Sequence, residues 1–116
     1  MKDELENYKG RVGRIPELPQ EQRARLLELT RCEDHKARSE LAEPFLKVVV
    51  AVAGECLRRE AWRGLDEREL IEHGNVVLLL ALNRFAEQCE GDLDAYVEVA
   101  LIADLDKFVQ AHPRGA

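Results

Sequence analysis

The spacing of apolar residues between positions 65 and 87 constrains the fold of this chain more than any other feature. Asp66 and Glu69 have the spacing of a helix capping box, and Leu65 can pack against Leu70 across that cap. The apolar residues that follow recur at intervals of three and four, as on one face of a helix: Leu70, Ile71, Val77, Leu78, Ala81, Leu82 and Phe85. The stretch predicts an amphipathic helix over about 66–87, whose apolar face requires other helices to cover it.

The same periodicity predicts three further helices. One spans about 19–31, and a second spans about 34–59, begins at Asp34 and bends at Pro44, because proline removes a backbone donor and clashes with the preceding turn. A fourth follows Gly91 and Asp92 and spans about 92–111. Its apolar stripe consists of Leu93, Val97, Leu101, Leu105 and Phe108. The fold class predicted is all-α, a compact bundle of about four helices without a β-sheet.

The 116 residues suffice for one domain with its own core. We expect a flexible leader at 1–14, where two glycines are mixed with charges, a single domain at 15–112, and a tail at 113–116. The first 25 residues hold no apolar stretch of the kind found in signal peptides, and the apolar runs elsewhere are too short to cross a bilayer. These features predict a cytoplasmic protein with no membrane partner.

No arrangement of residues in the sequence indicates catalysis. The chain has neither a Gly-rich phosphate loop nor a recognisable Ser/His/Asp or Cys/His set. Cys32, Cys56 and Cys89 form no CxxC pair, and the three histidines are far apart, so we expect reduced thiols and no metal site. The prediction is therefore a protein that is not an enzyme and that needs no cofactor.

The helix predicted at 66–87 also carries apolar and polar residues that lie outside its core face. At 100° per residue, several side chains fall away from the centre of the buried stripe: Glu69, Glu72, His73, Val76, Leu79 and Leu80. Apolar residues ringed by charges suit an interface with a helix of another protein. The alternative is that another segment, such as the N-terminal leader, covers these leucines.

These residues also carry a resemblance to a known family. Residues 66–85, "DERELIEHGNVVLLLALNRF", resemble the conserved-region-2 helix of bacterial RNA polymerase sigma factors, whose pattern is D-L-I-Q-E-G-N-x-G-L-x-x-A-x-x-x-F. Residues 18–53 are similar to the helices that precede it in that family, so the likeness covers about residues 15–108. The match in the region-2 helix keeps the family's spacing without gaps at Leu70, Ile71, Gly74, Asn75, Leu78, Ala81 and Phe85.

The resemblance implies a partner and a set of binding residues. In sigma factors this helix docks on the clamp helices of the β′ subunit of RNA polymerase. Carried over by position, the docking residues are Glu69, Glu72, His73, Asn75 and Leu79, with Leu79 as the apolar anchor in an exposed stripe. Two of these positions depart from the family, because Glu72 replaces the usual Gln and His73 replaces the usual Glu.

The stretch that matches the family's promoter-reading helix departs further. The family pattern F-S-T-Y-A-x-W-W-I-R-x-A-I captures unstacked bases of the −10 element. Here Tyr96 is retained and is the one candidate for DNA binding, with a core tyrosine as the alternative. Val99 and Ala100 replace the tryptophan pair, and Ile102 replaces the arginine. Base stacking and phosphate contacts depend on aromatic and cationic groups, so promoter DNA is a doubtful partner.

The distribution of charge favours the same conclusion. The net charge is −6, and residues 64–116 carry 11 acidic side chains against 4 basic ones. Basic side chains are concentrated in the N-terminal half, where they either contact DNA or form ordinary solvated helix faces: Arg23, Arg25, Arg31, Lys36, Arg38, Arg58, Arg59 and Arg63. No second helix-turn-helix domain is recognisable that would read a −35 element.

The sequence therefore predicts a sigma-factor-like transcription protein that binds core RNA polymerase and has weakened or lost −10 recognition. The alternative is a sigma mimic that binds an anti-sigma factor or another regulatory protein. A homodimer formed through the exposed leucines also stays open.

Overall fold

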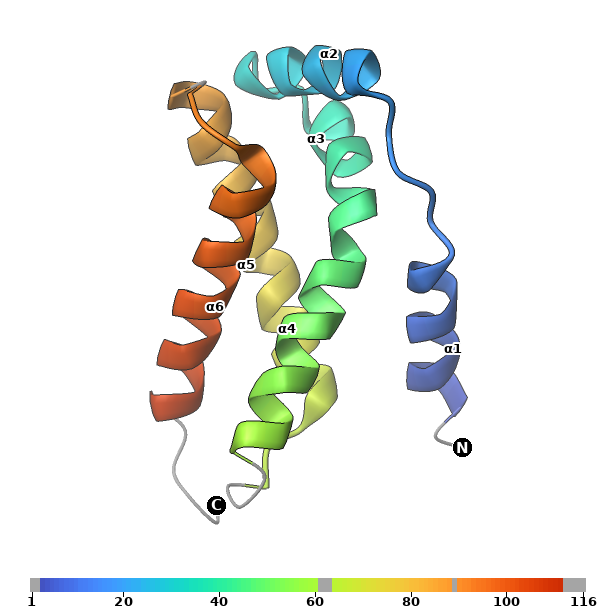
Figure 1. Ribbon diagram of the computed structural model, residues 1–116, viewed down its shortest axis with the longest axis vertical. Coiled ribbons are helices and arrows are strands. Elements are labelled where there is room, and N and C mark those ends of the chain that lie inside the picture. The colour runs from blue at the N-terminus through green and yellow to red at the C-terminus, as the bar shows by residue number, and fades with distance from the viewer. Residues whose placement is uncertain (1–2, 61–63, 89, 112–116) are drawn as a thin grey trace.

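The computed structural model describes residues 3–60, 64–88 and 90–111, and every regular element in these ranges is helical (Figure 1). The predicted all-α fold is confirmed. The elements are α1 (Asp3–Gly13), α2 (Gln20–Arg31), α3 (His35–Ala42), the 3₁₀ helix η1 (Glu43–Phe45), α4 (Leu46–Arg59), α5 (Glu67–Gln88) and α6 (Leu93–Ala111). Within the described ranges, none of the helices combines the length and the apolar character that crossing a membrane requires.

The helix starts lie where short polar side chains in the sequence predict them. The Asp34 carboxylate accepts a hydrogen bond from the Ala37 N–H at 3.0 Å. The carboxylates of Asp66 and Asp92 accept from backbone N–H groups two and three residues later, at 3.0 and 3.3 Å. Each bond satisfies a donor that the first turn of a helix leaves unpaired.

The bend predicted at Pro44 is present. Residues 34–59 form two helices, α3 and α4, joined by η1, and Pro44 lies in the first turn of this 3₁₀ segment. Proline is tolerated there because its missing N–H would have no helical partner.

Helix α5 lies at the centre of the bundle and packs against α2, α3, α4 and α6. In Figure 1, α4, α5 and α6 run along the long axis of the molecule, α5 lies behind the other two, and α2 crosses one end. The largest fully buried side chains include Leu70, Leu78 and Leu82 of α5, which pack in one core with Leu101 and Leu105 of α6. The apolar face predicted for α5 is the one that is buried.

Gly74 marks the close approach of α4 and α5. A Cβ atom at this position would lie 2.7 Å from Cγ1 of Val49, which is fully buried on α4. Glycine within a helix costs stability relative to alanine, roughly 0.5–1 kcal/mol. The glycine in the middle of α5 is therefore explained by packing between helices.

The N-terminal segment differs from the prediction. Residues 1–14 were expected to form a flexible leader, but Asp3–Gly13 form α1, which packs on α4. Val12 is 3% exposed, and the Lys9 ammonium lies 3.0 Å from the Glu67 carboxylate of α5. Leu5, Tyr8 and Val12 are spaced by three and four residues, so contacts with the bundle compensate for the two glycines. The predicted tail at 113–116 lies outside the described residues.

Candidate functional site

The outer face of α5 carries the predicted docking residues, but the five side chains do not form a single exposed stripe. Glu69 and Glu72 are exposed, whereas His73, Asn75 and Leu79 are half-buried. At 100° per residue, His73 and Asn75 lie on opposite sides of the two glutamates. His73 contacts α6, and Asn75 contacts α1.

The His73 side of α5 borders α6. The imidazole stacks on the Phe108 ring with centroids 4.5 Å apart and planes inclined by 21°. A shallow hollow of about 370 Å³ lies here, with Val76 and Leu80 on one side and Asp104 and Lys107 on the other. His73 therefore holds α5 and α6 together at the edge of this hollow.

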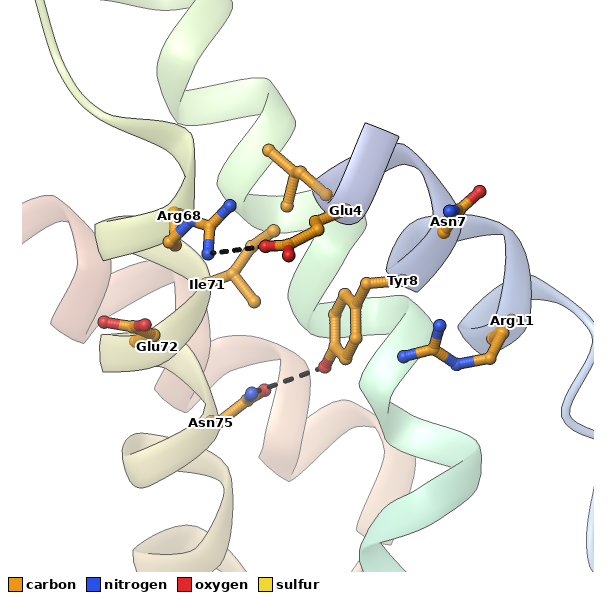
Figure 2. Close-up of a pocket in the computed structure, with 9 residues that line it drawn as sticks. Glu4, Asn7, Tyr8, Arg11, Arg68, Ile71, Glu72 and Asn75 are labelled. Carbon is orange, nitrogen blue, oxygen red and sulfur yellow. Dashed lines mark hydrogen bonds and ion pairs between the residues drawn. The ribbon is translucent and has the colours of Figure 1, made fainter. Parts of the chain in front are cut away.

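The Asn75 side of α5 lies beneath α1. Its amide nitrogen donates a long hydrogen bond of 3.4 Å to the Tyr8 hydroxyl, in a hollow of about 410 Å³ between α1 and α5 (Figure 2). The Arg68 guanidinium, on the same side, lies 3.9 Å from the Glu4 carboxylate of α1. A partner that contacts Asn75 must therefore also contact α1 or displace it.

The exposed apolar residues of α5 are Val76 and Leu80, whose exposures are 55% and 48%. Leu79 is half-buried and packs against the hydrophobic core, so its side chain is less exposed than predicted, and its role as an anchor stays a prediction. Leu79 lies one turn after Asn75 and shares its inward tilt, whereas Leu80 lies one turn after Val76. Helical spacing placed Leu79 away from the core together with Val76 and Leu80, and the transfer by resemblance then selected Leu79 as the anchor.

We call the exposed line along α5 the α5 ridge, which consists of Glu69, Glu72, Val76 and Leu80. These side chains recur every three or four residues, so they lie above one another along the helix. The first two are acidic and the last two are aliphatic. The α5 ridge is therefore suited to a helix that carries cations next to an apolar side chain.

The candidate DNA-binding residue, Tyr96 on α6, does not present an open ring on which a base could stack. Tyr96 is half-buried, and its ring packs against Phe85 of α5 with centroids 5.4 Å apart and planes inclined by 57°. The outer surface of α6 instead presents Val99 and Ile102, with exposures of 65% and 44%. A base that approaches this surface meets aliphatic groups.

Several basic side chains of the N-terminal half are paired with carboxylates. Arg23 of α2 forms an ion pair with Asp94 of α6, and its guanidinium lies 5.2 Å from the centre of the Phe45 ring. Arg59 of α4 lies 3.5 Å from Asp106 of α6. Arg31 and Arg58 pair with acids one turn earlier on their own helices. These pairs reduce the positive charge offered to a phosphate backbone. Arg63 lies outside the described residues.

Curated proteins that the chain matches include two RNA polymerase sigma factors. The chain is 32% identical over 83 residues to "RNA polymerase sigma factor SigA" of Clostridium acetobutylicum, and 31% identical over 83 residues to the protein of the same name from a Bacillus species. Each match covers 72% of this chain and 21% of the relative, so the chain spans about a fifth of the length of these curated relatives. No protein-family profile matches the chain. No solved structure matches it either.

Proposed function

The chain contains a sigma-factor-like region, and from this premise we propose that it is a transcription protein that binds core RNA polymerase through the α5 ridge. The observation that supports the ridge as the contact surface is the pair of large aliphatic side chains, Val76 and Leu80, left half-exposed beyond Glu69 and Glu72. Apolar groups at the centre of a charged surface are typical of protein interfaces. In the proposed contact Leu80 is the anchor. Glu69 and Glu72 favour a basic partner helix and accelerate its association.

The second part of the proposal is that recognition of the −10 element is weakened or lost. Tyr96 packs on Phe85, and the outward positions of α6 hold Val99 and Ile102. Stacking on an aromatic residue contributes roughly 1–3 kcal/mol per base, and aliphatic side chains do not supply it. Glu98 and Asp104 of α6 also repel phosphates, and Asp94 and Asp106 repel them less because they pair with Arg23 and Arg59.

Binding to purified core RNA polymerase, with a housekeeping sigma factor of the SigA kind as competitor, tests the first part. We expect a complex that the competitor displaces, because both proteins occupy the same surface. Glu69→Lys should slow association and weaken its dependence on salt, whereas Glu40→Lys on α3 is the matched control. A complex that the competitor does not displace would assign binding to a different surface.

Fluorescence anisotropy with labelled −10 single strands tests the second part. We expect no sequence-specific binding at physiological salt by the chain alone. Specific binding with a Kd of about 1 μM or tighter would restore the interpretation of α6 as a promoter-binding helix.

A second candidate function keeps the α5 ridge but changes the partner to an anti-sigma factor or another regulatory protein. The observation that favours it is His73, which stacks on Phe108 where the family resemblance implies an acidic residue. His73→Glu should strengthen polymerase binding if the partner is the basic clamp, and His73→Gln controls for the lost ring stacking. If both substitutions weaken polymerase binding equally, the regulatory partner is favoured.

A further inference from the structure

Helices α4 and α6 form a second exposed face, distinct from the α5 ridge. They run side by side in the same direction, with α5 behind them (Figure 1). A hollow of about 660 Å³ follows the line between them, with a floor of Val48, Ala51 and Val52 from α4 and Ile102 from α6. Val99, the most exposed of the large aliphatic side chains of the described residues, lies on the outer surface of α6. Contiguous exposed apolar surface of this kind marks interaction sites.

The two rims of this face carry opposite charge. The α4 rim carries the cations Lys47 and Arg59. Lys47 forms an ion pair with Glu17 at 3.2 Å, and Glu55 on the same rim forms one with Arg58. The α6 rim carries Glu98 and Asp106. The 3.5 Å ion pair between Arg59 and Asp106 shows that these two residues lie at the same height along the parallel helices.

We propose that this face pairs with the same face of a second copy of the chain, about a two-fold axis parallel to α4 and α6. Rotation about that axis places α4 of one protomer opposite α6 of its partner without changing heights. The Arg59 position then faces the partner's Asp106 at the same level, and the apolar floors close on each other. A two-fold contact is isologous, so each such charge pair occurs twice.

The alternative two-fold axis, perpendicular to the helices, is disfavoured by charge. It would place α6 opposite the partner's α6, with Glu98 and Asp106 facing like charges. Nucleic acid is disfavoured for the same reason, because its phosphates would lie along the acidic α6 rim. A second copy supplies both signs of charge and an apolar surface, and this inference does not depend on the function of the α5 ridge.

Sedimentation equilibrium over a range of protein concentrations tests the proposal. The wild-type chain should dimerise reversibly, and Ile102→Asp should weaken the dimer at least tenfold. Ala24→Asp, an equally drastic change at an exposed position on α2, should leave dimerisation unchanged. A wild-type chain that stays monomeric at about 100 μM overturns the proposal. An Ile102→Asp chain that dimerises as tightly as the wild type also overturns it. So does a monomeric wild-type chain that captures labelled single-stranded DNA when Ile102→Asp does not, because the face would then bind nucleic acid.

A charge-swap experiment tests the direction of the axis. Arg59→Glu alone and Asp106→Arg alone should each be monomeric, because each homodimer would place like charges opposite each other twice. An equimolar mixture of the two variants should recover the dimer, since each acid of the first variant then faces an arginine of the second. Both residues are about half exposed, so circular dichroism should show unchanged helix content. Failure of the mixture to recover the dimer contradicts the parallel axis.

Discussion

Gly74 shows how one missing side chain fixes the distance between two helices. The methyl group of Gly74→Ala would contact a β-branched, fully buried valine whose rotamer is restricted. Overpacking of this kind costs roughly 1–3 kcal/mol, which exceeds the gain of alanine over glycine in a helix. We expect Gly74→Ala to destabilise the chain in urea denaturation.

The valine on the opposite helix provides the control for this prediction. Val49→Ala removes the methyl that the new Cβ would meet at 2.7 Å. The double variant should therefore lose less stability than the sum of the two single changes. A stabilised Gly74→Ala chain would mean that α4 and α5 separate easily.

Three consecutive leucines on α5 test which residues belong to the core. Leu78 is 1% exposed, Leu79 is half-buried, and Leu80 is 48% exposed. Leu78→Ala should cost about 2–5 kcal/mol of unfolding free energy, Leu79→Ala less, and Leu80→Ala within about 0.5 kcal/mol of zero. Thermal and urea unfolding of the three variants measure this order. An equal loss at Leu78 and Leu80 would contradict the orientation of the helix.

At the scale of elements, local signals explain which helices the sequence could predict. The start of α3 and the break at Gly91, whose φ is 95°, depend on side chains or glycines within a few residues of the boundary. Helix α1 was missed because it depends on contacts distant in sequence. Its ion pair joins Lys9 to Glu67, 58 residues away, and periodicity within a single segment does not reveal such a partner.

The same ion pair predicts a pH dependence for the docking of α1. The hydrogen bond from the Lys9 ammonium to Glu67 raises the pKa of Lys9 above 10.5. A group whose pKa is higher in the folded state stabilises the fold at pH values below its unfolded-state pKa. This contribution is lost as the pH rises through the folded-state pKa. Lys9→Met should therefore lower the melting temperature near neutral pH, and the difference from wild type should disappear at strongly alkaline pH.

The expected magnitude is small, because the Lys9 side chain is 26% exposed and pairs of this kind contribute about 1 kcal/mol or less. Lys36→Met, at an exposed position on α3, is the matched control and should show no such convergence. A constant difference between wild type and Lys9→Met across the alkaline range would show that packing, and not charge, determines the effect.

For the whole molecule, the sequence predicted the all-α bundle and the face of α5 that it buries, because apolar periodicity determines both. It could not predict which leucine of α5 is exposed. Leu79 and Leu80 are adjacent leucines, and their difference in exposure depends on how α5 is rotated against its neighbours. The family resemblance points to a helix, but which of its side chains are exposed depends on packing in this chain.

The central claim is that the α5 ridge binds core RNA polymerase, and the affinity of matched variants tests it most directly. The measurement is the Kd of the purified chain for core enzyme, for wild type, Leu80→Asp and Ile102→Asp. The first variant changes the α5 ridge, and the second makes the same chemical change on the face between α4 and α6 at similar exposure. Loss of an interface anchor typically costs about 2 kcal/mol or more, so Leu80→Asp should weaken binding well over tenfold, while Ile102→Asp should bind as wild type does. Wild-type affinity in Leu80→Asp, or a matching loss in Ile102→Asp, would contradict the account.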